Sequence, residues 1–238
     1  MGYEVWDKSL DDLNLNVKNL NKFIINTINP HSYVVAKKDN LFQEALKNSD
    51  VLVPDGSGIV LAAKFIKGKK IQKIAGADVH KYLLDKANQE GLRVFYMGSS
   101  QGTLDKIKEK LKKEYPNIKA GFYSPPFKPE FDENDNKEII EKINEFKPDI
   151  LFVGMTAPKQ EKWLYQHKDK IDFKIASSIG AVFDFYAGNV KRPPQLIIDM
   201  HLEWLFRFLQ EPKRLWRRNF VSTPLFLMDM IKYKFKKS

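Results

Sequence analysis

Val51-Leu52-Val53-Pro54-Asp55-Gly56-Ser57-Gly58 is the stretch of sequence that decides the fold. Its first three residues form a short apolar run, which is typical of a buried strand in a parallel sheet. Pro54 and Gly56 then turn the chain, and Ser57 is expected to cap a mostly buried helix that includes residues 59–65. Asp55 is therefore predicted to lie at the carboxyl end of a strand, where open α/β sheets keep their ligand crevice. The alternative is an ordinary turn residue whose carboxylate bonds only to its own backbone.

The same succession of apolar run, loop and helical pattern continues along the rest of the chain. Further strands are expected at residues 23–29, 92–97, 118–123, 150–153 and 173–177. Helices are expected after Asp39, from Ala77 up to Gly91, over residues 103–113 and 134–146, and from Pro158 onward, whereas the apolar run 32–36 has no clear type. Strands that alternate with helices predict an α/β fold, with a mostly parallel, Rossmann-like sheet covered by helices and a helical C-terminal appendage.

Polar and glycine residues follow the carboxyl ends of five of the expected strands. These positions are Thr27, Asp55, Gly98–Ser99, Gly154–Thr156 and Gly180. Loops on one edge of a parallel sheet border one crevice, so a ligand site is expected there. The Gly98–Ser99 loop also opens a helix, whose first N–H groups favour a phosphate, and a plain connecting loop is an equal alternative.

The amino-acid composition of the chain excludes several kinds of site and of protein. The 238 residues are 43% hydrophobic, which suits one core domain, placed at 1–194, with an appendage at 195–238. The chain has no cysteine, so disulfides, thiolate metal sites and cysteine nucleophiles are excluded, and its four histidines show no metal-ligand spacing. It shows no signal peptide and no window with the roughly 20 apolar residues of a spanning helix. We therefore expect a cytoplasmic protein, either in solution or on a membrane surface.

Positive charge is concentrated near the C-terminus. Nine of the Lys and Arg residues and three acidic residues lie between 201 and 238, so this final sixth carries +6 of the net charge of +10. Such asymmetry indicates an anionic partner, which could be phosphate, nucleic acid or lipid headgroups. Aromatic and aliphatic residues between 204 and 235 are interleaved with these cations, which favours an anchor on an anionic membrane surface over nucleic acid. The alternatives are a solvated basic tail and a helix packed on the core.

Several short motifs, taken together, resemble one enzyme family over nearly the whole chain. They are Thr27-Ile28-Asn29-Pro30, the turn 54–58, Pro158-Lys159-Gln160-Glu161, the segment 183–188 and the C-terminal pieces 202–205, 211–212 and 214–218. In this order the motifs resemble the WecG/TagA/CpsF glycosyltransferases. The resemblance implies an inverting, metal-independent transfer of an N-acetylmannosamine-type sugar from a UDP donor to undecaprenyl-diphosphate-linked N-acetylglucosamine, in surface polysaccharide or teichoic acid synthesis, without a cofactor.

The resemblance also assigns roles to individual residues. Asp55 matches the family's proposed catalytic base, with Thr27 and Gln160 as further active-site residues. The expected donor and nucleotide contacts are Asn29, Gly98, Ser99, Gly154 and Asp184, although Asp184 could equally have a structural role in its turn. The expected diphosphate contacts are Arg207, Arg214 and Arg217, whose guanidinium groups suit phosphate oxygens. We expect the protein on the inner face of the cell membrane, where docking would fold the appendage over the crevice.

Other functions remain open at this point. The same fold could transfer a different hexose or a uronic acid in capsule or exopolysaccharide synthesis. A non-catalytic nucleotide-sugar or nucleic-acid binder could use the same basic tail. A nicotinamide-dependent oxidoreductase is disfavoured because the chain lacks a Gly-x-Gly-x-x-Gly motif. Homo-oligomer formation is left open.

Overall fold

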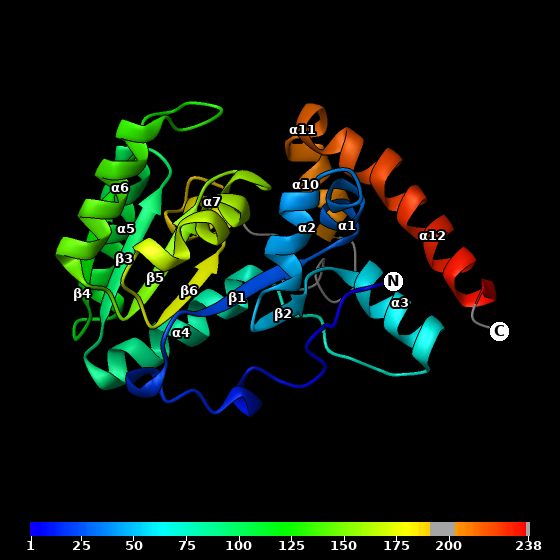
Figure 1. The fold of residues 1–238 in the computed structure, drawn as a ribbon, viewed down its shortest axis with the longest axis horizontal. Coiled ribbons are helices and arrows are strands. Elements are labelled where there is room, and N and C mark those ends of the chain that lie inside the picture. The colour runs from blue at the N-terminus through cyan, green and yellow to red at the C-terminus, as the bar shows by residue number, and fades with distance from the viewer. Residues whose placement is uncertain (191–202, 237–238) are drawn as a thin grey trace.

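The computed structural model describes residues 1–190 and 203–236 and contains one sheet of six strands (Figure 1). The order across the sheet is β2-β1-β6-β5-β3-β4, and every neighbouring pair is parallel, which confirms the predicted fold class. The strands are β1 Phe23–Ile28, β2 Val51–Pro54, β3 Arg93–Gly98, β4 Lys119–Tyr123, β5 Ile150–Gly154 and β6 Ile175–Ser178.

Helices connect the strands and cover both faces of the sheet. Those of the core are α1 Pro30–Ala36, α2 Asn40–Lys47, α3 Ser57–Lys67, α4 Gly76–Glu90, α5 Gln101–Glu114, α6 Glu133–Phe146, α7 Lys159–His167 and α8 Gly180–Tyr186, with short 3-10 turns at Asp11–Leu13, Val17–Asn19 and Lys168–Lys170. The C-terminal part holds α10 Glu203–Gln210, α11 Pro212–Arg217, a π-helical segment Arg218–Ser222 and α12 Thr223–Lys236.

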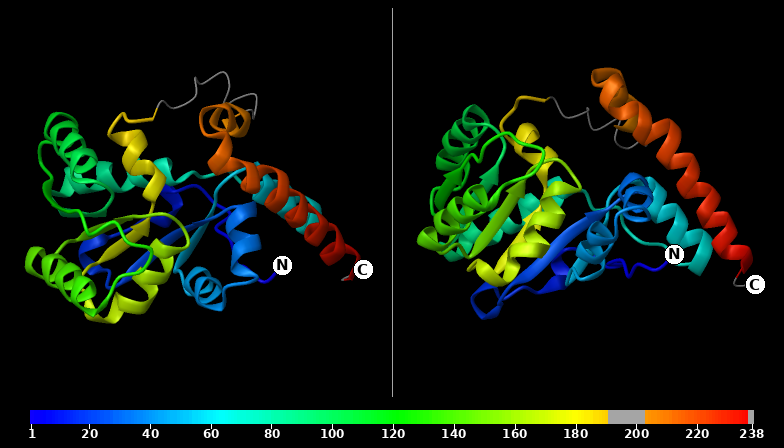
Figure 2. Two further views of the ribbon diagram at one scale, coloured as in Figure 1. Left: turned by 90° about the horizontal axis from the view of Figure 1, so that it is seen from above. Right: turned by 45° about the horizontal axis from the view of Figure 1, so that its top comes forward.

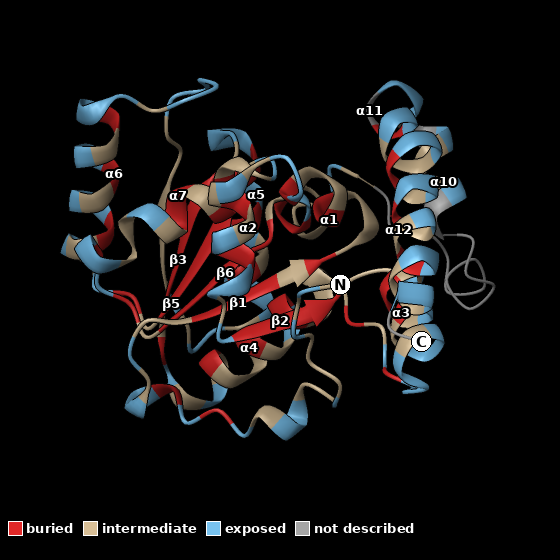
Figure 3. Ribbon diagram, turned by 45° about the vertical axis from the view of Figure 1, so that its right-hand side comes forward, coloured by how far each residue is buried: buried red, intermediate tan, exposed pale blue. Residues whose placement is uncertain are grey.

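The core follows from the two-residue period of the strands, which sends alternate side chains to opposite faces. On β3, Val94 and Tyr96 belong to the apolar cluster beneath α4, α5 and α8. Phe95 and Met97 belong to the cluster beneath α6 and α7. All four are buried, and so is nearly every residue of the central strands, as parallel sheets covered on both faces require (Figure 3).

Two details near the ends of β1 and β2 differ from the sequence predictions. Strand β1 ends at Ile28 because Asn29 starts α1: its side-chain oxygen accepts hydrogen bonds from the backbone N–H groups of His31 and Ser32, each at 3.0 Å. The apolar run 32–36 is therefore helical. The expected capping by Ser57 is wrong, because Ser57 is the first residue of α3 and the N-cap position is Gly56, with φ 92° and no side-chain cap.

The last helix packs on the core beside the carboxyl ends of β1 and β2 (Figures 1 and 2). It contacts α1 and α3, and its Phe226 and Met230 are buried in the same cluster as residues of both helices. The expectation that these two side chains belong to a membrane-facing surface is wrong, because one stripe of the helix completes the core instead. The boundary predicted between residues 194 and 195 lies outside the described residues.

Polar contacts also join the C-terminal part to α1. The imidazole Nδ1 of His31 lies 2.8 Å from the hydroxyl of Ser222, and Lys37 forms an ion pair with Asp229 at 2.6 Å. At the start of α3, Gly58 leaves room for both neighbours: a β-carbon on it would lie 2.5 Å from Cγ of Pro30 and 3.7 Å from the ring of Phe226. Helices α1, α3 and α12 therefore meet at one point.

Candidate active site

Asp55 and Thr27 lie at the carboxyl ends of neighbouring strands. Thr27 is the register partner of Val53, and the backbone N–H of Asp55 donates to the carbonyl of Ile28 at 2.9 Å, so pairing continues past β2. The two-residue period places Asp55 and Thr27 on the same face as Val53. Both side chains are half-buried, so a carboxylate and a hydroxyl stand together at the rim of the sheet.

Asn29 follows Thr27 and serves first as the cap of α1. Its amide oxygen is engaged by the N–H groups at the helix start, and its own backbone N–H donates to the hydroxyl of Ser32 at 2.8 Å. In the part of the chain that the structure describes, nothing engages the amide nitrogen, which is left for the expected donor contact.

Gly98 and Gly154 bring the ends of β3 and β5 into close contact. A β-carbon on Gly98 would lie 2.3 Å from the carbonyl oxygen of Gly154, and one on Gly154 would lie 2.3 Å from the ring of Phe183. Gly98 has φ 122°, and the next residue, Ser99, has φ 58° and donates its N–H to the Gly154 carbonyl at 2.9 Å. These residues therefore shape the loop, and the N-cap of the following helix is Ser100.

Gln160 connects the loops that follow β5 and β6. Its side-chain oxygen accepts hydrogen bonds from the backbone N–H of Met155 at 3.2 Å and of Gly180 at 3.0 Å. Its amide nitrogen donates to Oε1 of Glu161 at 2.9 Å. The side chain is buried, so the amide of this expected active-site residue is largely occupied in joining the two loops.

Asp184 lies in a polar cluster between α5 and α8. Its carboxylate accepts from the amide of Asn189 at 3.1 Å, and that amide also donates to the hydroxyl of Thr103 at 2.9 Å. Lys106 donates to the oxygen of Asn189 at 2.6 Å. These contacts fit the alternative that Asp184 has a structural role in its turn. A contact of Asp184 with the donor nucleotide stays a prediction.

The three arginines expected to bind diphosphate lie in the C-terminal helices. Arg207 belongs to α10 and Arg214 to α11, and their side chains are not among those described. Arg217 ends α11 and is exposed, beside Trp216, whose ring contacts that of Phe220 in a tilted arrangement with 4.6 Å between centroids. The π-helical segment that follows Arg217 contacts α1, the helix that Asn29 caps. Arg217 is therefore next in the chain to a segment that packs on α1.

Sequence reasoning missed the buried polar residues near Gln160. Glu161 enters the sequence analysis only as part of the motif 158–161, yet burial raises the pKa of its carboxyl to about 7. Ser177 and Ser178 on β6 are also buried, and within residues 1–190 and 203–236 no partner reaches their hydroxyls. The only available signal was their polar character at the end of an otherwise apolar strand.

A comparison with known families accounts for this arrangement of motifs. The family described as "Glycosyl transferase WecG/TagA/CpsF family" matches residues 2–238 of the chain. The chain belongs to this glycosyltransferase family.

Relatives of this glycosyltransferase carry one common description, N-acetylglucosaminyldiphosphoundecaprenol N-acetyl-beta-D-mannosaminyltransferase. The protein of Bacillus spizizenii is 34% identical over 218 residues, which are 91% of this chain and 81% of the relative. The protein of Bacillus subtilis is 32% identical over 209 residues, 88% and 79% of the two chains. A Staphylococcus aureus protein is 28% identical over 216 residues, 91% and 82% of the two chains.

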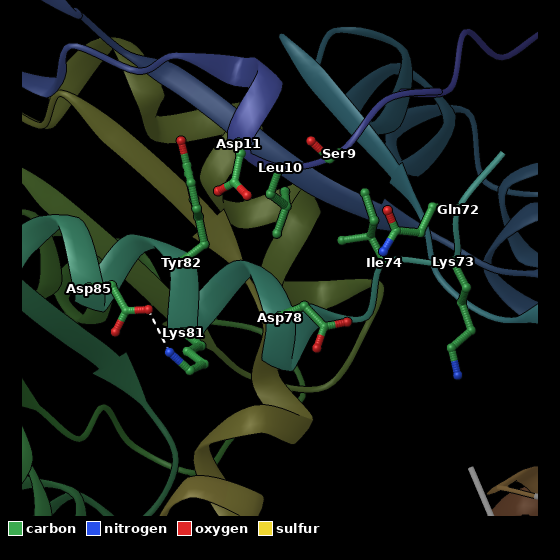
Figure 4. A pocket seen from close by; sticks show the side chains of 10 residues that line it. All are labelled: Ser9, Leu10, Asp11, Gln72, Lys73, Ile74, Asp78, Lys81, Tyr82 and Asp85. Carbon is green, nitrogen blue, oxygen red and sulfur yellow. Dashed lines mark hydrogen bonds and ion pairs between the residues drawn. The ribbon is translucent and has the colours of Figure 1, made fainter. Parts of the chain in front are cut away.

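The glycosyltransferase also has a pocket of about 290 Å³ away from these residues (Figure 4). It lies between the N-terminal segment and α4, and is lined by Ser9, Leu10, Asp11, Gln72, Lys73, Ile74, Asp78, Lys81, Tyr82 and Asp85. None of the predicted site residues lines it. Lys81 and Asp85 form an ion pair of 2.6 Å at its edge.

In residues 1–190 and 203–236, no three His, Asp or Glu side chains are grouped so that they could hold a metal ion. In the same residues, no helix has the length and apolar character needed to cross a membrane.

Proposed function

We propose that this chain transfers an N-acetylmannosamine-type sugar from a UDP donor to an undecaprenyl-diphosphate-linked N-acetylglucosamine, with inversion at the anomeric carbon. The relatives' descriptions name this acceptor and this sugar, and family membership supplies the reaction class. The single structural observation that supports the proposal most is the pairing of Asp55 and Thr27 at the ends of adjacent strands.

In the proposed reaction Asp55 is the general base. Its carboxylate takes the proton of the acceptor hydroxyl as that oxygen attacks the anomeric carbon of the donor sugar. The new glycosidic bond forms while the bond to the UDP oxygen breaks, and UDP leaves with the electron pair. Inversion follows because attack and departure occur on opposite faces of the sugar. Thr27 is placed to orient the carboxylate or to bond a substrate hydroxyl.

The leaving diphosphate gains negative charge, which cations must stabilise. We assign this role to Arg207, Arg214 and Arg217, because a guanidinium group offers two parallel N–H donors to phosphate oxygens. Donor contacts are assigned to Asn29, Gly98, Ser99, Gly154 and Asp184. Of these residues, Asn29 would contact the ligand through its side-chain amide nitrogen. Gly98 and Gly154 approach each other closely, so at the ends of β3 and β5 we expect backbone groups to contact the ligand.

We also propose that the C-terminal helices dock on the anionic inner face of the cell membrane, where the lipid-linked acceptor is held. Residues 195–238 would then be an appendage to the catalytic core 1–194. The exposed large apolar side chains of this part support the proposal, and they are Leu205, Leu209, Trp216, Phe220, Val221, Leu225, Met228, Ile231 and Phe235. Exposed cations accompany them at Lys213, Arg217, Lys232 and Lys236, as anionic lipid requires.

Helix α3 extends this apolar surface. It contacts α12 and exposes Leu61 and Phe65, which lie one helical turn apart. In this arrangement α12 stays packed on the core, so docking would orient the whole molecule and bring α10 and α11 toward the crevice. A homo-oligomer is also retained as a proposal, which sedimentation with and without vesicles would test.

Release of UDP tests the proposed reaction. The protein is incubated with a panel of UDP-sugars and a lipid-diphosphate N-acetylglucosamine analogue, and turnover is expected with UDP-N-acetylmannosamine. Asp55→Asn should bind UDP normally and lose at least about a hundredfold in kcat. The matched control is Asp12→Asn, which removes an exposed carboxylate that bonds only to Ser9 among the described contacts. Near-normal turnover by Asp55→Asn would remove this residue from the mechanism.

A further inference from the structure

Glu161 is a buried carboxyl for which the proposed reaction has no role. It lies in the first turn of α7, and only 4% of its surface is exposed. Burial raises the pKa of its carboxyl to about 7, and the hydrogen bond from Gln160 opposes this rise. In the part of the chain that the structure describes, nothing bonds to its second oxygen, Oε2. A carboxyl in such a place costs stability.

Within residues 1–190 and 203–236, the one side chain bonded to Glu161 is its neighbour in the sequence. The amide nitrogen of Gln160 donates to Oε1 of Glu161 at 2.9 Å. This bond fixes which end of the Gln160 amide faces which way, because a carboxyl oxygen at that position attracts the nitrogen. With the nitrogen held there, the amide oxygen faces the N–H groups of Met155 and Gly180. A reversed amide would set its N–H₂ against two N–H donors and lose both bonds.

The orientation of this amide matters because of what it joins. Met155 follows directly after β5, and Gly180 is the first residue of α8, after β6. These two loops lie on the edge of the sheet that carries Thr27 and Asp55. One amide oxygen, shared between two backbone donors, therefore sets the spacing of two loops at the edge of the sheet that carries Thr27 and Asp55.

We propose that Glu161 is a positioning residue of this site, which holds the Gln160 amide in the orientation that joins the loops after β5 and β6. Glu161 acts through Gln160 and contacts no substrate. The effect on the loops follows from the contacts alone, whereas the effect on turnover rests on the proposed function. The two parts are tested separately.

Backbone hydrogen exchange tests the effect on the loops without any substrate. Glu161→Met removes the acceptor at similar length, and should speed exchange of the Met155 and Gly180 amides at least about tenfold. Glu161→Gln keeps an acceptor oxygen and should stay within about threefold of the unmodified protein. Gln160→Met removes the shared oxygen itself and gives the upper limit for the increase in exchange rate of these two amides. Unchanged exchange at both amides in Glu161→Met would overturn the proposal. If that variant does not fold, Glu161→Asp, whose oxygen is one methylene further away, provides the same comparison.

A double-mutant cycle tests the effect on turnover. Glu161→Met should lower kcat at least about tenfold, and Glu161→Gln should largely restore it. In the Gln160→Met background the same Glu161→Met change should have no further effect, because its influence passes through that amide. Additive losses would mean that Glu161 acts independently, which contradicts the proposal. Absence of turnover in the unmodified protein would count against the proposed function, and the exchange measurements would still decide the role of Glu161.

Discussion

Gly180 approaches Met155 so closely that a β-carbon on the glycine would lie 1.9 Å from the Met155 carbonyl oxygen. The contact is with backbone, which cannot rotate away as a flexible side chain could. Gly180→Ala should therefore force the loops after β5 and β6 apart and lower the free energy of unfolding by about 1–3 kcal/mol. Urea denaturation measures this loss. We also expect turnover to fall, because the displaced loops lie at the edge of the sheet that carries Thr27 and Asp55.

The matched control for this substitution is Gly102→Ala in the first turn of α5. A β-carbon on Gly102 would meet nothing within 4 Å. Alanine favours the helix, so this variant should be as stable as the unmodified protein or more stable by about 0.5 kcal/mol. Equal losses in the two variants would contradict the close-approach argument.

Replacing Glu161 by glutamine should change stability in a pH-dependent manner. Burial raises the pKa of Glu161 from its ordinary 4.5 to about 7, so the folded protein binds this proton more tightly than the unfolded chain does. The contribution of the protonated Glu161 carboxyl to the free energy of unfolding is complete below pH 4.5 and is lost as pH rises through 7. Between pH 4 and pH 8, Glu161→Gln should therefore gain on the order of 3 kcal/mol relative to the unmodified protein. Denaturation of both proteins at each pH measures the difference, and a constant difference would show that Glu161 does not titrate in this range.

Membrane binding should depend on the exposed side of α12. Met228 is 52% exposed and Phe235 is 73% exposed, and replacing both with serine should lower binding to anionic vesicles at least about tenfold, without loss of stability. Phe226, 1% exposed, is the matched control on the opposite stripe. Phe226→Ala should instead lower the free energy of unfolding by about 3–5 kcal/mol. Vesicle co-sedimentation and urea denaturation separate the two effects, and unchanged binding by the serine variant would exclude this surface as the membrane contact.

Two substitutions of Asn29 distinguish its role as the cap of α1 from its proposed contact with the UDP-sugar donor. Asn29→Ala should cost about 1 kcal/mol of stability, because the N–H groups at the helix start lose their acceptor. Asn29→Asp keeps that acceptor and the stability, but it removes the amide nitrogen. If this nitrogen bonds the donor, KM for the UDP-sugar should rise in Asn29→Asp. An unchanged KM would leave Asn29 with the cap as its only role.

Sequence periodicity predicted the sheet well because buried parallel strands are short apolar runs, and the carboxyl end of each run could be located. The run 51–53 therefore placed Asp55 correctly relative to its strand and to Thr27. Helix α1 was not assigned because Asn29-Pro30 was interpreted as the end of a strand, although Asn followed by Pro is also a helix start.

Tertiary contacts determine which side of α12 is buried and which groups bond to Gln160, and neither could be predicted from the sequence. Helix α12 carries large apolar residues on two sides, and its pattern does not indicate that Phe226 and Met230, rather than Met228 and Phe235, face the core. Similarly, Gln160 is polar and starts a helix, which suggested an amide open to ligand. Only the folded chain brings the N–H groups of Met155 and Gly180 to its oxygen.

The three-helix contact at Gly58 links the C-terminal helices, which we propose dock on the membrane, to the strand ends that carry Thr27 and Asp55. Helices α1 and α3 start directly after the segments that carry Thr27 and Asp55, and Gly58 sits between Pro30 at the head of α1 and Phe226 of α12. The depth at which α12 rests on a bilayer would then fix the height of Asp55 above the lipid surface. If the C-terminal helices dock as proposed, a rigid spacing of this kind would select acceptors by the distance of their terminal sugar from the membrane, independently of the identity of that sugar.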